Sequence, residues 1–309
     1  MTTSPPSAPE QRRPPESIRA IPVRHPGRWV AMAVIAVLAA MFANSVLTNP
    51  NWQWNFQWEN AFAPAVVRGV VTTLWLTALA MVLGVLLGVA LAVMRLSPNP
   101  VLSGAAWFYV WVFRGTPVLV QLVIWGNLNS LYRKISLGVP FGPEWLVFET
   151  RDLIPPVAAA LLGLGLNEAA YMSEIIRAGI LSVDEGQSEA ASALGLSRMT
   201  TLRRIVLPQA MRVVVPPTGN ETISMLKTTS LVAYVPYYEL FFQTSAIGSR
   251  TFQPFPMLVT ASLWYLAMTS VLMTAQYYIE RYYARGSVRS LPPTPIQRLR
   301  VRLTGSELR

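Results

Sequence analysis

The chain has 309 residues, of which 52% are hydrophobic and only 13% are charged. A soluble domain carries about 25% charged residues, and several apolar stretches of this chain approach or exceed the ~20 residues that cross a bilayer as a helix. The composition therefore predicts an all-α integral membrane protein. The absence of cysteine excludes disulfides and thiolate metal sites. A formal charge of +10 does not indicate a nucleic-acid partner, because the arginines gather in the tails and in one loop beside apolar segments.

The N-terminal part begins with a tail, residues 1–28, that is rich in proline and arginine, and continues with an apolar run over residues 29–48. A cleaved signal peptide is the competing interpretation, but its apolar core is usually ~7–15 residues long and ends at small residues. This run is longer, and Thr48-Asn49-Pro50-Asn51 is a poor cleavage site. We therefore expect an uncleaved transmembrane helix.

Hydropathy predicts five further spans, which makes about six in all. They cover roughly residues 64–94, 101–126, 153–180, 211–240 and 257–280. Pro117 is expected to interrupt the second of these five, and Pro216-Pro217 and Pro236 are expected to break the fourth. Residues 127–152 form a polar connection, and residues 285–309 form a basic tail.

The distribution of positive charge predicts the orientation. With the N-terminus inside, nearly all the lysines and arginines outside the apolar segments fall on the cytoplasmic side. The exceptions are Arg133, Lys134, Arg151 and Arg250. By the positive-inside rule, both termini and the loop around Glu189–Pro208 are cytoplasmic.

That loop has the sequence EAASALGLSRMTTLRRIVLP. Its first residues, from Glu189 to Leu194, favour a helix because alanine is the best helix former. Gly195 suits the left-handed residue that ends a helix, and Ser197 can cap the next one. The arginines that follow could hold the second helix at the membrane surface or against acidic groups of a partner. Taken alone, such a helix is more often a plain connector.

The full spacing is more specific. Glu189-Ala190-Ala191, three residues, Gly195, nine residues and then Ile205-x-Leu207-Pro208 resembles the EAA loop of ABC importer permeases. The flanking segments resemble the polar amino acid uptake family, over roughly residues 64–284, with the EAA loop at 186–208. The matching segments are Phe113-Arg114-Gly115-Thr116-Pro117-x-Leu119-Val120-Gln121, Asn167-Glu168-Ala169-Ala170-Tyr171-x-x-Glu174-Ile175-x-Arg177, Pro208-Gln209-Ala210, Pro216-Pro217-x-Gly219-Asn220 and Leu226-Lys227-x-Thr229-Ser230-Leu231.

Two departures from the family pattern stand out. The chain adds a span before the usual five-helix core and has a long connection at 127–152. Thr228 also follows Lys227 where relatives often have aspartate, which weakens a charge-pair role for that lysine.

The resemblance implies a type I ABC importer permease fold and a permease subunit that takes up a polar amino acid or a related compound by alternating access. In that family the loop is a coupling helix that docks on a cytoplasmic ATPase, so the implied coupling residues are Glu189, Ala190, Ala191, Gly195, Ile205, Leu207 and Pro208. The implied partners are a dimer of ATPase subunits, a second permease subunit that is identical or related, and an extracytoplasmic solute-binding protein. The implied location is the bacterial inner membrane, in contact with its lipid.

The chain itself has no site for ATP. A P-loop needs Gly-x-x-x-x-Gly-Lys-Ser/Thr, whereas the lysines here are Lys134 and Lys227, and Leu226 precedes the second. We therefore expect ATP and magnesium on the partner ATPase and no cofactor on this chain. The only histidine is His25, so no histidine-based catalytic site or zinc site is expected either. The chain is predicted not to be an enzyme.

Charged residues within the predicted spans mark a candidate translocation site, because ionisable groups at membrane depth are costly. Glu168 is the best candidate for binding an ammonium group, with Asn167 and Tyr171 as neighbours, and Arg114 is a candidate for a carboxylate. Glu221 is a further candidate. An equally weighted alternative is that Arg114 only neutralises one of the two glutamates.

Three smaller expectations concern packing and the overall class. Gly84-x-x-x-Gly88 favours helix packing over a binding site, and Glu174 with Arg177 has the spacing of an ion pair on one helix. The alternatives from other classes are an ion-gradient-driven secondary transporter, which would use inverted repeats rather than an EAA loop, and a structural or signalling membrane protein.

Overall fold

The computed structural model describes residues 26–139 and 142–283. The predicted tail at 285–309 therefore lies outside the described residues. So does the predicted tail at 1–28, apart from its last three residues, and His25 is among the residues outside. Two units are described separately, one ending at Trp52 and the other beginning at Gln53.

The first unit contains α1, Pro26–Thr48, and a short 3₁₀ helix, Pro50–Trp52. No charged side chain occurs between Trp29 and Thr48, and apolar residues occur on all sides of the helix. A helix that is apolar all round is typical of a membrane span, so α1 has the character expected for residues 29–48.

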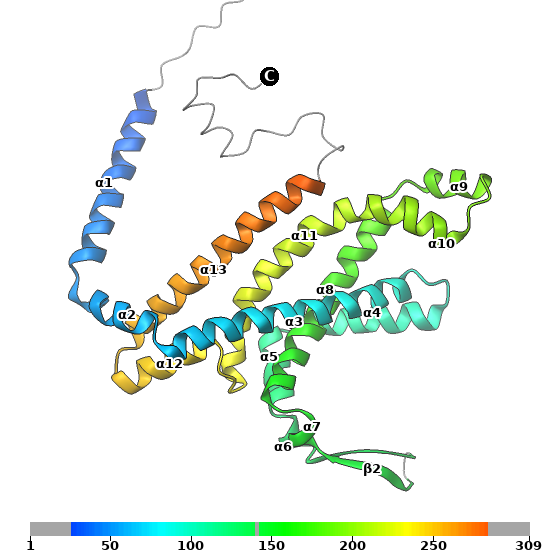
Figure 1. The fold of residues 1–309 in the computed structure, drawn as a ribbon, viewed down its shortest axis with the longest axis horizontal. Coiled ribbons are helices and arrows are strands. Elements are labelled where there is room, and N and C mark those ends of the chain that lie inside the picture. Colours follow the sequence, from blue (N-terminus) through cyan, green and yellow to red (C-terminus); the bar gives the residue numbers. More distant parts are fainter. Residues whose placement is uncertain (1–25, 140–141, 284–309) are drawn as a thin grey trace, which may run out of the picture. The chain divides into compact units, whose positions relative to one another are not determined.

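The second unit consists mainly of helices (Figure 1). Its longer helices are α3 (Pro64–Arg95), α4 (Pro100–Gly115), α5 (Val118–Gly126), α8 (Pro156–Leu181), α11 (Leu207–Thr228), α12 (Leu240–Thr251) and α13 (Pro254–Tyr283). Its shorter helical elements are α2 (Trp54–Ala61), α6 (Leu128–Leu131), α7 (Thr150–Leu153), α9 (Glu185–Ala193), α10 (Arg198–Thr201), the π-helix η2 (Leu202–Val206) and the 3₁₀ helix η3 (Thr229–Tyr234).

Each of the six predicted spans contains a helix. Within the described residues, α1, α3 and α13 are long and apolar enough to cross a membrane, and α4 with α5 makes a fourth span if the bent pair is counted as one. The bend between α4 and α5 is 98° and lies at Pro117, where the interruption was expected. The helices α8 and α11 are also long, but both contain charged residues, among them Glu168 and Glu221.

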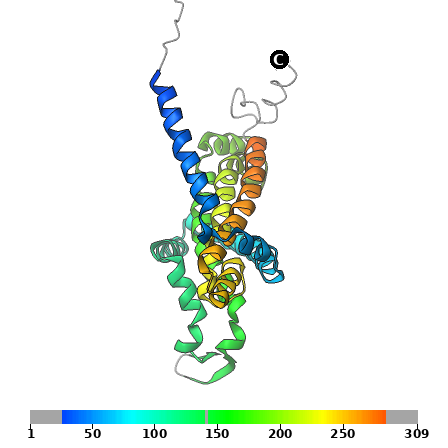
Figure 2. The ribbon, with the colours of Figure 1, turned by 90° about the vertical axis from the view of Figure 1, so that its left-hand side faces the viewer.

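The predicted break at Pro216-Pro217 is wrong, because α11 continues through both prolines. A proline removes one backbone donor from a helix, and neighbouring helices can compensate in a membrane protein. Here the amide of Gln276 on α13 donates to the carbonyl of Pro216 at 2.9 Å. Gly219 makes room for this amide, since a Cβ at that position would collide with Gln276. Figures 1 and 2 show α11 and α13 side by side, in agreement with their contacts.

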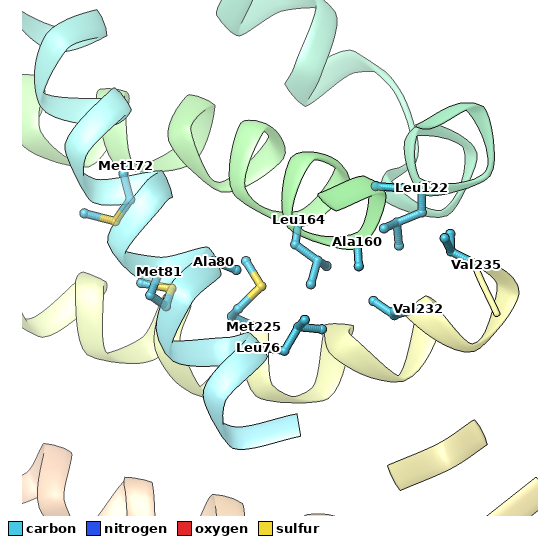
Figure 3. Packing of buried hydrophobic residues seen from close by; sticks show 11 residues of the cluster. Leu76, Ala80, Met81, Leu122, Ala160, Leu164, Met172, Met225, Val232 and Val235 are labelled. Atoms are coloured by element: carbon cyan, nitrogen blue, oxygen red, sulfur yellow. The ribbon is translucent and has the colours of Figure 1, made fainter. Parts of the chain in front are cut away.

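The packing of α3 against α8 confirms the expectation for Gly84-x-x-x-Gly88. A Cβ on Gly84 would overlap the side chain of Glu168, and a Cβ on Gly88 would lie 2.6 Å from Cβ of Met172. The two glycines therefore allow the helices to approach closely. One hydrophobic core grows from this contact and adds residues of α5, α11 and η3 (Figure 3). Its labelled members are Leu76, Ala80, Met81, Leu122, Ala160, Leu164, Met172, Met225, Val232 and Val235.

Several regular elements are absent from the sequence prediction, among them a β-hairpin and the helix α12. Part of the connection at 127–152 is an antiparallel hairpin of β1 (Lys134–Gly138) and β2 (Glu144–Glu149), with Lys134 opposite Glu149. The strand residues are almost all exposed, so no buried face marks them in the sequence. The helix α12 also lies between the predicted spans, and the buried carboxylate of Glu239 caps it by accepting the amide of Phe241 at 2.8 Å and that of Phe242 at 2.5 Å.

Candidate functional site

The first candidate region is the segment from Asp184 to Val206, which contains α9, α10 and η2 and which we call the EAA segment. Its turn has the predicted geometry: Gly195 is left-handed, with φ of 72°. The amide of Leu196 donates to the carbonyl of Ala191 at 3.0 Å, and the amide of Gly195 donates to that of Ser192 at 3.0 Å. These two bonds form a Schellman motif, which satisfies the last carbonyls of α9. Ser197 then caps α10 by accepting the amide of Thr200 at 3.3 Å.

Most of the residues implied in coupling lie at the surface. Glu189, Ala190, Gly195, Leu207 and Pro208 are exposed, Ile205 is half-buried, and only Ala191 is buried. Ala191 is buried where α9 packs against α10 and η2. The segment therefore holds its own shape through local contacts and leaves its outer face open.

The sequence analysis missed two apolar side chains of the EAA segment. Leu194 is 79% exposed and Met199 is 57% exposed. Within the described residues, both large apolar side chains are therefore left largely uncovered. A cavity of about 550 Å³ between α9 and the α10–η2 side adds a recess, lined by Glu189, Ser192 and Arg198 among others.

The second candidate region surrounds Glu168, which is 4% exposed on α8. Its side chain faces Gly84 of α3, and its Oε1 has no hydrogen-bond partner among the described residues. Burial without a partner is costly for a carboxylate. Glu221 of α11 lies close enough to Glu168 for electrostatic interaction, so two carboxylates share this part of the structure.

Arg114 lies at the end of α4, and its guanidinium is 5.1 Å from the ring centroid of Tyr171 on α8. That distance is within the range of a cation–π contact, which extends to about 6 Å. Arg114 interacts electrostatically with Glu221, but within the described part of the chain it forms no ion pair with Glu168 or Glu221. The alternative that Arg114 directly neutralises a glutamate therefore has no ion pair to support it here.

Asn167 is hydrogen-bonded to the bend between α4 and α5. Its amide donates to the carbonyl of Phe113 at 2.8 Å and to Oε1 of Gln121 at 3.2 Å. The amide of Gln121 in turn donates to the carbonyls of Phe113 and Thr116 at 3.0 and 3.1 Å. These bonds satisfy backbone groups that the 98° bend between α4 and α5 leaves free. In this structure the amide of Asn167 therefore holds the bend.

The predicted pair of Glu174 and Arg177 is confirmed, with an Oε2 to Nη2 distance of 2.6 Å. Arg95 at the end of α3 also approaches Glu174, with 3.6 Å between Nε and Oε1. The cluster thus ties the last turn of α3 to α8. Sequence spacing alone indicated the pair within one helix, whereas the contribution of Arg95 depends on tertiary structure.

Other polar residues with clear structural roles were not predicted. Glu239 is fully buried, and Tyr265 donates to its Oε2 at 2.9 Å. Gln121 and Gln276 hold helix irregularities at Pro117 and Pro216. Gln121 and Gln276 carry no spacing signal, because they act on backbone groups that a proline exposes or that are distant in the sequence.

The chain combines several apolar helices, an exposed EAA segment and charged residues inside its helices. These features are typical of a membrane transport subunit. Residues 84–285 match the family described as "Binding-protein-dependent transport system inner membrane component". Because the match covers more than half of the chain, the chain belongs to this family. It is a multi-pass protein of the inner membrane, and family members are permease subunits that are not enzymes themselves.

Similar proteins agree with this assignment. The chain is 50% identical over 279 residues to the arginine transport system permease protein ArgU of Corynebacterium glutamicum, covering 90% of this chain and 86% of that protein. It is 37% identical over 196 residues to the nopaline transport system permease protein NocM of Agrobacterium fabrum, covering 61% of this chain and 76% of that one.

Solved structures confirm the fold. A crystal structure titled as an amino acid ABC transporter with histidines matches with a TM-score of 0.61 at 34% identity, covering 72% of this chain and 95% of that chain. An inward-facing MetNI methionine ABC transporter matches with a TM-score of 0.58 at 19% identity, covering 72% and 97%, and so bears on the fold alone. The predicted type I fold and the predicted function as an ABC importer permease are confirmed.

Proposed function

We propose that the chain is the permease of an importer for a cationic amino acid, with arginine as the first candidate. The carrying observation is the buried carboxylate of Glu168, whose Oε1 lacks a hydrogen-bond partner among the described residues and which lies close to Glu221. With both carboxyl groups ionised, Glu168 and Glu221 outnumber Arg114 by one charge. A ligand with two cationic groups and one carboxylate complements that set, and the 50% identical relative is named as an arginine permease.

In this proposal Glu168 binds a cationic group of the ligand, and Glu221 contributes to the second cationic position. Arg114 binds the carboxylate, and Tyr171 holds its guanidinium by the 5.1 Å contact. Asn167 acts as a positioning residue, since its amide is bonded to the α4–α5 bend that carries Arg114. Ionisable groups at membrane depth commonly mark such a pathway.

We further propose that the EAA segment docks on a partner ATPase. The exposed Leu194 and Met199 would enter a groove on that subunit. The buried Ala191 would support the contact from within the segment. The other residues at or near the contact would be Glu189, Ala190, Gly195, Ile205, Leu207 and Pro208. ATP and magnesium would be bound by the ATPase, and this chain would bind no cofactor. ATP-driven closure of two ATPase subunits would move the EAA segments and switch the pore between inward- and outward-facing forms.

The complete transporter in this proposal has two permease subunits, either identical or related, and an extracytoplasmic solute-binding protein that delivers the ligand. Both termini and the EAA segment face the cytoplasm, because the arginines concentrate on that side. The β1–β2 hairpin then lies on the outer side, at the other end of α8 from α9 (Figure 1). It could contact the binding protein, since its strands are exposed.

The test is arginine uptake into proteoliposomes that contain the complete transporter. We expect Glu168→Gln to reduce kcat/KM for uptake by roughly 30-fold or more, since removing one partner of a buried charge pair costs about 2–5 kcal/mol. Glu59→Gln, at an exposed position of α2, is the matched control and should leave uptake unchanged. Unchanged uptake by a fully assembled Glu168→Gln transporter would contradict the substrate role. Uptake that persists in vanadate would instead favour an ion-driven transporter.

A further inference from the structure

A large cavity lies among α3, α8, α11 and α13. Its lining includes Met172, one helical turn along α8 from Glu168, and Thr222, which follows Glu221, but neither glutamate lines it. It has a volume of about 1090 Å³. Its walls are formed mainly by aliphatic side chains, and Val89, Ile176, Val215 and Ile279 represent the four helices. Apolar groups that fill such a cavity in a membrane-embedded protein gain free energy, because the burial of apolar surface is favourable.

The polar residues of the cavity wall are satisfied by the protein itself. The hydroxyl of Thr218 donates to the carbonyl of Val214 at 2.8 Å, and the hydroxyl of Thr222 donates to that of Thr218 at 2.9 Å. The amide of Gln276 donates to Pro216 and to Glu280. A zwitterionic amino acid would find no carboxylate in this wall, so the cavity does not suit the transported ligand.

Positive charge occurs at only one place in the cavity. Among the described residues that line the cavity, Arg198 is the one ionisable side chain. Ser97 is a second polar residue of the lining, and like Arg198 it lies outside the long helices. Ser97 follows the end of α3, and Arg198 is the first residue of α10, in the part of the sequence where arginines concentrate. Within the described part of the chain, Arg198 is exposed and forms no ion pair.

We propose that this cavity is a binding site for an anionic phospholipid of the inner leaflet. The acyl chains lie against the aliphatic walls between α3 and α11, and the phosphate binds the guanidinium of Arg198. The apolar walls complement the acyl chains of such a lipid, and the unpaired guanidinium complements its phosphate. Basic pockets between helices on the cytoplasmic side are known to bind anionic headgroups. A transmembrane helix of a second subunit would cover the walls but would need an acidic residue for Arg198.

The site also touches the proposed coupling machinery. Arg198 and Leu202 line this cavity as well as the recess beside α9. A bound lipid would therefore support the EAA segment from the membrane side. The lipid site does not depend on which substrate is transported, so its test can fail or succeed independently of the Glu168 proposal.

The first experiment is native mass spectrometry of the complete transporter with phosphatidylglycerol or phosphatidylethanolamine added. We expect preferential retention of phosphatidylglycerol. Arg198→Gln should weaken it roughly fivefold, the factor that corresponds to about 1 kcal/mol for one basic residue near the membrane surface. The matched control is Arg203→Gln, because Arg203 is exposed in the same segment but does not line the cavity.

The second experiment fills the cavity. Val89→Trp places a large side chain in the wall, whereas Leu86→Trp lies on an exposed part of α3 that does not line the cavity. A phosphatidylglycerol with a photoreactive group in its acyl chain should label α3 and α11 in the wild type and in Leu86→Trp, but not in Val89→Trp.

Two results would overturn the proposal. One is equal retention of both lipids together with no effect of Arg198→Gln. The other is efficient cross-linking of Val89→Cys to a second permease subunit, because that subunit and not a lipid would then occupy the cavity.

Discussion

The EAA segment and the Glu168 region differ in the range of the contacts that shape them. In the EAA segment, the turn at Gly195 and the cap at Ser197 are made by hydrogen bonds between residues at most five positions apart. In the Glu168 region, the close neighbours come from other helices: Gly84 lies on α3 and Glu221 on α11. The first is an exposed segment shaped by local contacts, and the second is a buried region assembled from several helices.

This difference predicts separate responses to mutation. Substitutions in the EAA segment should disturb one segment and its partner while the bundle stays folded. Substitutions around Glu168 should change the stability of the bundle together with transport, because the same contacts pack the helices. The following experiments test this separation in order of the expected effect.

The largest effect is expected at Gly84. A Cβ there would overlap the side chain of Glu168, and overpacking of this kind costs about 1–3 kcal/mol. We expect Gly84→Ala to lower the midpoint temperature of unfolding in detergent and to reduce uptake in parallel. Gly104→Ala is the control, since no atom lies within 4 Å of a Cβ at Gly104. Equal stability of the two variants would show that α3 and α8 are not closely packed.

A similar effect is expected at the bend between α4 and α5. Gln121→Ala would leave the carbonyls of Phe113 and Thr116 without this donor, which costs about 1–3 kcal/mol for buried groups. Thermal unfolding measures the loss, and Gln187→Ala, at an exposed position of α9, should have no effect. If the variant changed KM alone at full stability, Gln121 would have to act on the ligand rather than on the bend.

A smaller and local effect is expected at Gly195. A side chain in the left-handed conformation costs about 1–2 kcal/mol, and asparagine tolerates it better than other residues. Gly195→Val should therefore reduce transport-stimulated ATP hydrolysis by roughly five- to thirtyfold, whereas Gly195→Asn should retain most of it. The bundle should unfold at the wild-type temperature in both variants. Undiminished uptake and ATP hydrolysis in Gly195→Val would remove the case for coupling through this turn.

The smallest effect is expected at Ser197. Loss of the cap in Ser197→Ala should destabilise α10 by about 1 kcal/mol, which hydrogen exchange of the Thr200 amide can measure. Ser192→Ala is the control, because the Ser192 hydroxyl only donates to the carbonyl of Ser188 within its own helix, and it should stay within about 0.5 kcal/mol. A global loss of stability in Ser197→Ala would contradict the local character of the EAA segment.

Much of the fold could be predicted because long apolar runs have few alternatives in a membrane. The apolar run over residues 64–94 became α3, and Pro117 produced the expected bend. The break expected at Pro216-Pro217 was wrong because Gln276 and Gly219 allow α13 to pack against the prolines. The β1–β2 hairpin was missed because its exposed strands have no buried face to reveal them.

The sequence by itself determined the family, the membrane class and the geometry of the EAA segment, since spacing, hydropathy and local hydrogen bonds depend on neighbouring residues. Only the tertiary structure decided which charged residues meet: it brought Glu168 and Glu221 together, turned Asn167 toward the bend, and joined Arg95 to Glu174. The physical reason is that helix packing determines which side chains face each other across helices, and sequence spacing carries no information about that rotation and depth.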